Sequence, residues 1–157
     1  MNQLIEKTYS FTEAALAAGM GPKALRNWID RGLINLEADE NRDGDEWRRF
    51  TLYDVLRLAA TRELVEFGVS VAEAFRIADA ILARARMLLM YKNTPANVIK
   101  SGFMPLAHLV FPIGKDKWDY YDVAKTELDQ KATTLPGVVV INLYVIIGLV
   151  FVNLGIE

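Results

Sequence analysis

Residues 19–34 read GMGPKALRNWIDRGLI, and this stretch decides the fold of the first half of the chain. Pro22 suits the first position of a helix, where its missing N–H costs no hydrogen bond, and Gly32 is a typical helix stop. Three residues at i, i+3 and i+4 spacing form an apolar face: Leu25, Trp28 and Ile29. The opposite face is polar and carries Lys23, Arg26, Asn27 and Asp30. The stretch therefore predicts a turn and then a short amphipathic helix with one solvent-facing polar side.

Capping boxes predict helix starts on both sides of this helix. In this motif a Ser or Thr side chain accepts a hydrogen bond from the third helical amide, and the acidic residue there reaches back to the cap N–H. The pattern occurs at Ser10–Glu13, Thr51–Asp54 and Ser70–Glu73. Glycines that follow the helical runs are typical stops. The predicted helices are 11–18, 23–31, 51–67 and 70 to about 91.

Two short apolar runs flank a polar segment between the second and third predicted helices. Leu33-Ile34 precedes the segment, Trp47–Phe50 follows it, and Asp43-Gly44 lies near its tip. This arrangement predicts a β-hairpin. The tip is acidic, with Arg42 against Glu37, Asp39, Glu40, Asp43, Asp45 and Glu46. Such a tip repels phosphates at close range, so it either points away from nucleic acid or serves another purpose.

The order helix, turn, helix, hairpin, helix, helix is that of a winged helix-turn-helix. In this fold the exposed face of the second helix enters the major groove, where Arg or Lys pairs with guanine and Asn with adenine. Arginines of the wing are placed to neutralise phosphates. The predicted DNA-binding residues are Lys23, Arg26, Asn27, Arg48 and Arg49. Trp28 and Trp47 are expected to be packing residues.

Several segments resemble motifs of MerR-type transcriptional regulators over residues 9 to about 85. They are YSFTEAA (9–15), ALRNW (24–28), RGLI (31–34), WRRFT (47–51) with Asp54-Val55, and FGVSVAE (67–73). The resemblance implies that Arg26 and Arg48 are recurrent DNA-contacting arginines, with Lys23, Asn27 and Arg49 as further contacts. Asn27 departs from the family, which usually has Tyr there. The change removes an aromatic contact to the DNA backbone and adds an amide that can read a base.

Composition excludes several other function classes. The 157 residues include no cysteine, so disulfides, thiolate ligands and cysteine nucleophiles are absent. The formal net charge is −2, so DNA binding must come from a local basic patch. His108, the single histidine, is expected to be structural. The chain has no phosphate-binding loop, dinucleotide fingerprint, nucleophile elbow or HExxH motif, so we expect no enzyme, cofactor or metal site.

The C-terminal half has no such pattern. Composition changes after about Met90, and Asn93-Thr94-Pro95 has the form of a linker. We therefore predict an α+β protein with a DNA-binding domain at 1–90 and an α/β dimerisation or sensing region at 91–157. Residues 97–111 are compatible with a short helix or strands, and 119–131 are predicted to be helical. The scattered acids there lack calcium-loop spacing and are expected to be solvated: Asp116, Asp119, Asp122, Glu127 and Asp129.

Residues 138–156 are almost uninterrupted apolar sequence, long enough to raise a membrane anchor. They are rich in β-branched residues, Gly148 divides them into two runs of strand length, and no Lys or Arg follows Lys131. These features favour buried β-strands over the anchor. Both strand faces are apolar and should be covered on both sides, which in so short a chain favours burial against a second copy.

Together these features predict a cytoplasmic, homodimeric, sequence-specific transcriptional regulator that binds double-stranded DNA. Residues 1–10 carry Glu6 and Lys7 and lack an apolar core, so we expect no secretory signal. Two alternatives stay open. One is a phage or mobile-element accessory factor of the excisionase or packaging type. The other is a protein-interaction or membrane-tethered module whose acidic wing binds a basic partner.

Overall fold

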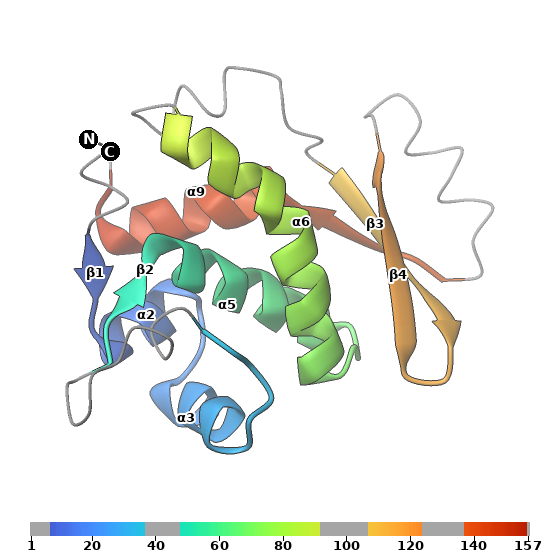
Figure 1. Cartoon of the computed structure of the whole chain (residues 1–157), viewed down its shortest axis with the longest axis horizontal. Helices are drawn as coiled ribbons and strands as arrows, with labels where there is room; N and C mark the ends of the chain where they lie inside the picture. The colour runs from blue at the N-terminus through green and yellow to red at the C-terminus, as the bar shows by residue number, and fades with distance from the viewer. Residues whose placement is uncertain (1–6, 37–47, 92–106, 124–136, 157) are drawn as a thin grey trace.

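The computed structural model describes residues 7–36, 48–91, 107–123 and 137–156. Helices dominate the first half, and a small antiparallel sheet with one more helix makes up the second, so the fold is α+β as predicted (Figure 1). The N-terminal elements are β1 (Thr8–Tyr9), α2 (Phe11–Ala17), α3 (Pro22–Asp30), β2 (Phe50–Thr51), α5 (Leu52–Glu66) and α6 (Val71–Tyr91). The C-terminal elements are β3 (Ala107–Gly114), β4 (Lys117–Val123), β5 (Val139–Asn142) and α9 (Leu143–Leu154).

The predicted helix starts are confirmed, and two of them have complete capping boxes. The Ser10 backbone N–H donates to Glu13 Oε2 at 2.7 Å, and the Glu13 N–H donates to Ser10 Oγ at 3.4 Å. Thr51 and Asp54 exchange the same pair of bonds at 3.1 Å each. Pro22 occupies the first turn of α3, where its missing N–H costs nothing. Local sequence therefore sets the starts of these helices.

The observed strand pairing differs from the predicted hairpin. β2 pairs with β1, with Tyr9 opposite Phe50, whereas Leu33-Ile34 belongs to no strand. Phe50 is fully buried, and Phe11 packs edge-on against its ring. The acidic tip and Trp47 lie outside the described residues. The wing is thus anchored by a strand from before the first helix, which no local pattern signals.

The helix predicted over 119–131 is wrong over residues 119–123, which belong to β4. β4 pairs with β3, and β3 pairs on its other edge with β5, both antiparallel. Lys115 and Asp116 make the tight turn, and Asp116 takes a left-handed φ of 57°. Aromatic residues favour strands because they pack well across a pleated sheet, and here they include Trp118, Tyr120 and Tyr121. The rest of the predicted helix lies outside the described residues.

The two strands predicted over 138–156 are also wrong beyond Asn142. Only β5 is a strand, and α9 runs through Gly148 as a continuous helix. Asn142 caps it, because Oδ1 accepts from the N–H groups of Tyr144 at 3.1 Å and Val145 at 3.4 Å. Gly155 ends it with a φ of 64°. Packing of α9 against α5 and α2 outweighs the preference of its β-branched residues for strands (Figure 1).

The chain itself covers this segment only on one side, and its predicted burial against a second copy stays a prediction. Leu143, Ile147 and Val150 are buried, but several residues on the other side are 42–76% exposed: Val140, Tyr144, Val145, Leu149 and Val152. None of the described helices combines the length and apolarity needed to cross a membrane.

The buried residues form one continuous core that includes both halves of the chain. Asn153 Nδ2 donates to the Ala17 carbonyl at 3.2 Å, which ties α9 to the end of α2. On the other side, Glu73 accepts from the Trp118 N–H at 3.1 Å, and Arg76 donates to the Trp118 carbonyl at 2.9 Å. The β3–β4 hairpin is thereby attached to the first turns of α6. The division near residue 90 stays a prediction, but the two parts share their core.

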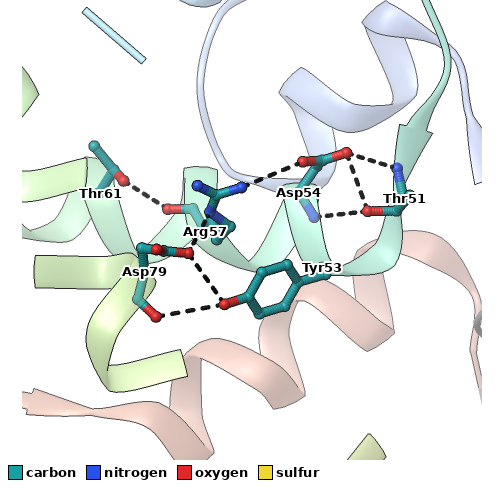
Figure 2. A network of polar contacts seen from close by, with 6 residues as sticks. All are labelled: Thr51, Tyr53, Asp54, Arg57, Thr61 and Asp79. Atoms are coloured by element: carbon teal, nitrogen blue, oxygen red, sulfur yellow. Dashed lines mark hydrogen bonds and ion pairs between the residues drawn. The ribbon is translucent and has the colours of Figure 1, made fainter. Parts of the chain in front are cut away.

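A buried arginine joins α5 to α6 (Figure 2). The Arg57 side chain is 10% exposed and lies 3.0 Å from Asp79 Oδ1 and 3.8 Å from Asp54 Oδ1. Its guanidinium carbon lies over the rings of Phe75 at 4.3 Å and Tyr53 at 5.4 Å. The Tyr53 hydroxyl donates to the same Asp79 carboxylate at 3.2 Å. This network fixes the angle between the two helices that support the helix-turn-helix.

Candidate nucleic-acid interface

α3 is anchored on one face and open on the other, as its spacing predicted. Leu25 is fully buried, Trp28 nearly so, and Ile29 is half-buried. The opposite face is exposed, and a shallow open groove runs along it, lined by Gly21, Lys23, Ala24, Arg26, Asn27 and Asp30. Three of the predicted DNA-binding residues, Lys23, Arg26 and Asn27, therefore share one solvent-facing surface.

The turn between α2 and α3 positions this surface. The Met20 N–H donates to the Ala15 carbonyl at 3.0 Å, and Gly19 has a φ of 72°, which L side chains rarely adopt. A Cβ at Gly19 would lie 3.3 Å from the Arg62 guanidinium. The positive φ therefore favours glycine here, and the tight turn holds α3 against α2.

Arg26 is held by an aromatic side chain that sequence reasoning missed. Its guanidinium carbon lies 5.4 Å from the centre of the Phe11 ring, a cation–π distance. Phe11 in turn packs on Phe50, with ring centres 5.9 Å apart and planes at 69°. The contact joins α3 to the start of α2 and to β2. An available signal was the aromatic at position 11, where the MerR pattern has Ile.

Arg49 is committed in part to the protein. Its Nε donates to Thr8 Oγ1 and its Nη2 to the Thr8 carbonyl, both at 3.2 Å, so it joins the wing strand to β1. A guanidinium has five N–H donors, and others remain for a phosphate. Arg49 is exposed and Arg48 half-buried. Arg49 therefore contacts Thr8 in β1. Arg26 contacts Phe11 at the start of α2, three residues after Thr8.

Positive charge surrounds the start of α2. The pKa of Glu13 is lowered, first by its hydrogen bonds with Ser10 and further by the positive charges of Arg49 and Lys7. Lys7 Nζ lies 5.5 Å from the centre of the Tyr9 ring. Lys7, Arg26 and Arg49 thus lie around one helix end, next to the exposed face of α3. This local basic patch exists in a chain whose net charge is −2.

Residues 9–81 match a family model described as MerR HTH family regulatory protein. They form a MerR-type helix-turn-helix domain. Among curated proteins, none matches the chain. The matched region contains α2, α3, α5 and the first half of α6, with α3 as the second helix of the motif. The MerR-type domain supports a DNA-binding regulator, and its match leaves residues 82–157 out.

The remaining candidate residues lie away from the MerR-type domain's exposed face. His108 is buried in β3, opposite Asp122 on β4 and Ile141 on β5. In the part of the chain that the structure describes, no three histidine or acidic side chains are grouped closely enough to hold a metal ion.

Proposed function

We propose that the protein is a sequence-specific transcription regulator that binds double-stranded DNA as a homodimer. The observation that carries the proposal is the exposed polar face of α3, held by a buried apolar face and flanked by positive charge at the start of α2. In the major groove, Arg26 and Asn27 have the donors and acceptors that distinguish base pairs. Lys23, Arg48 and Arg49 supply charge for phosphates.

Phosphate contacts and base contacts affect the affinity for DNA in different ways. A phosphate contact contributes to affinity on every sequence and releases a counterion, so its loss lowers the slope of log K against log salt by about 0.9. A base contact is lost only on the matching sequence, at about 1–3 kcal/mol for a bidentate pair. Measuring affinity across both salt and sequence therefore separates positioning residues from base-reading ones.

The test is fluorescence anisotropy on a duplex selected by the full chain from a randomised library. We expect Arg26→Ala to weaken binding about 5- to 150-fold on the selected duplex, the range of a lost bidentate pair. We expect Arg48→Ala to weaken binding on all duplexes and to flatten the salt dependence by about one unit. Lys115→Ala, in the β3–β4 turn, removes the same charge from another element and serves as the control. Affinity unchanged in both arginine variants would contradict the proposal.

The homodimer is supported by the exposed apolar face of α9. Val145, Leu149 and Val152 lie at i, i+4 and i+7, so they share one side of the helix, and they are 50%, 53% and 76% exposed. Tyr144 and Val140 extend the apolar surface toward β5. Residues 138–156 include no charged side chain. A surface of this kind suits an equally apolar one, and in a two-fold dimer the same patch meets itself.

The area of the exposed apolar face and the backbone of α9 both support a second copy of the chain as the partner that covers this face. The five exposed residues offer on the order of 450 Å² per copy, so two copies with their flanking atoms approach the roughly 1,200 Å² of a small specific interface. Gly148 lies on the same side of α9, and nothing within 4 Å would meet a Cβ there. Glycine inside a helix costs about 1 kcal/mol relative to alanine, and close approach of another backbone is a reason to keep it.

Sedimentation of full-length variants tests the dimer. Deleting the segment would remove core residues such as Leu143, so a surface substitution is the cleaner change. We expect Leu149→Lys to turn the dimer into a monomer while the thermal midpoint of the fold stays close to that of the parent. Ile113→Lys is the matched control, because Ile113 is a 60% exposed apolar residue on β3. A monomeric parent chain, or a dimer that survives Leu149→Lys, would show that α9 is not the interface.

A further inference from the structure

We infer that Phe11 is a specificity-determining positioning residue whose ring fixes the Arg26 guanidinium for a bidentate contact with one guanine. The inference rests on the proposed DNA binding and adds a residue that does not itself read DNA. It follows from the contact between the Arg26 guanidinium and the Phe11 ring, 5.4 Å apart, on the exposed side of the helix-turn-helix.

The ring is a rigid support. Phe11 is the first residue of α2, directly after the Ser10 cap, and both capping-box hydrogen bonds fix the backbone at this point. Its edge-on contact with Phe50 holds the ring, and Phe50 itself is 0% exposed. Phe11 is half-buried, so one part of the ring packs inward while another faces the arginine. The position of the Phe11 ring is therefore fixed by the capped helix start and by the buried Phe50.

The contact leaves the hydrogen-bonding groups of Arg26 available. A cation–π contact uses the positive charge of the guanidinium and needs none of its five N–H donors. Within the described residues, no ion pair or side-chain hydrogen bond involves Arg26. The donors that form a fork for the guanine O6 and N7 acceptors are thus free to face the groove.

The orientation of the Arg26 guanidinium matters more for a contact with guanine than for a contact with a phosphate. A bidentate pair requires the guanidinium plane to align with the base edge, whereas a phosphate accepts hydrogen bonds from a wide range of directions. A long arginine side chain that is already ordered loses less freedom on binding. The ring of Phe11 therefore increases the preference for guanine and adds little to affinity for DNA of arbitrary sequence.

The test uses the full chain, the selected duplex and a second duplex in which the guanine facing Arg26 is replaced. Phe11→Leu keeps an apolar side chain at the core edge but has no π face. Phe11→Tyr keeps the π face and is the control. An exposed cation–π contact corresponds to a factor of about two to five, so we expect Phe11→Leu to lower the guanine preference by that factor. The salt dependence should not change, and Phe11→Tyr should retain the preference.

A double-mutant cycle shows whether Phe11 acts through Arg26. In the Arg26→Ala background, Phe11→Leu should have no further effect on the guanine preference. Thermal unfolding of each variant checks the fold, and Phe11→Met, which fills a similar volume, replaces Phe11→Leu if the latter unfolds. An unchanged guanine preference in Phe11→Leu or Phe11→Met, or an equal loss with Arg26 absent, would overturn the inference. If Arg26→Ala itself has no effect, the proposed DNA contact of Arg26 fails instead.

Discussion

Ile147→Ala probes whether α9 is part of the core of the MerR-type domain, although it lies far beyond residue 81. Ile147 is 2% exposed on the side of α9 that packs with α5 and α2. The substitution removes three carbon atoms from a continuous core and leaves a cavity. Buried Ile or Leu to Ala changes cost about 2–5 kcal/mol of unfolding free energy. With a urea m-value of about 2 kcal/mol/M, the unfolding midpoint should fall by roughly 1–2.5 M.

The assay is urea unfolding of the full chain, followed by circular dichroism and by tryptophan fluorescence. Trp28 lies in α3 and is nearly buried, so it contributes a signal from the helix-turn-helix. Because the core is shared, we expect both signals to shift together in one transition. Leu16→Ala, at a 60% exposed position of α2 outside the proposed dimer surface, should change the unfolding free energy by less than about 0.5 kcal/mol. If Ile147→Ala shifts only a separate C-terminal transition and leaves the fluorescence midpoint in place, α9 does not belong to this core.

Three further predictions concern contacts outside the interface. Arg57→Met should cost about 3 kcal/mol of unfolding free energy, because it removes a buried guanidinium that lies 3.0 Å from the Asp79 carboxylate and 3.8 Å from that of Asp54. Arg76→Met, at a 52% exposed side chain, should cost under about 1 kcal/mol in the same urea assay. Gly155→Ala should lower the thermal midpoint by the equivalent of about 1 kcal/mol, since φ is 64° and no neighbour would clash with the added Cβ. The hydrogen bond from Arg76 lowers the pKa of Glu73, so Glu73 stabilises the fold above its unfolded pKa of about 4.3 and loses this contribution as pH falls through the lower folded value. The stability difference between the parent and Glu73→Gln should therefore be present at pH 7 and vanish in acid, and a difference that persists at pH 2 would contradict this role.

Local signals allowed the first half of the fold to be predicted. Capping boxes at Ser10 and Thr51, and the periodicity of α3, depend on neighbours three or four residues away, and the sequence shows those directly. The exposed face with Lys23, Arg26 and Asn27 follows from the same periodicity. The strand partner of Phe50 and the Thr8 contact of Arg49 join residues 41 positions apart. No local pattern indicates such pairs. The sequence points to them only through its resemblance to MerR-type regulators.

The prediction for the C-terminal half failed for a different reason. A segment whose odd and even positions are both apolar fits a buried strand and a buried helix equally well. Its β-branched residues favoured strands, while the decisive helix signals were a cap at Asn142 and a stop at Gly155. These signals were present but were outweighed in the prediction. For β4, the acidic residues suggested a solvated helix, whereas the aromatic residues between them pair across the sheet with β3.

The position of α9 connects the two parts of the proposed function. One side of the helix packs on α2 and α5, and the opposite side carries the exposed apolar residues. Asn153 binds the Ala17 carbonyl, two residues before the Gly19 turn that leads into α3. In the proposed dimer, the interface and the recognition helix are therefore connected through α2, which packs on both α9 and α3. Two recognition helices held in this way have a fixed separation, so the dimer can select the spacing of two half-sites as well as their sequence.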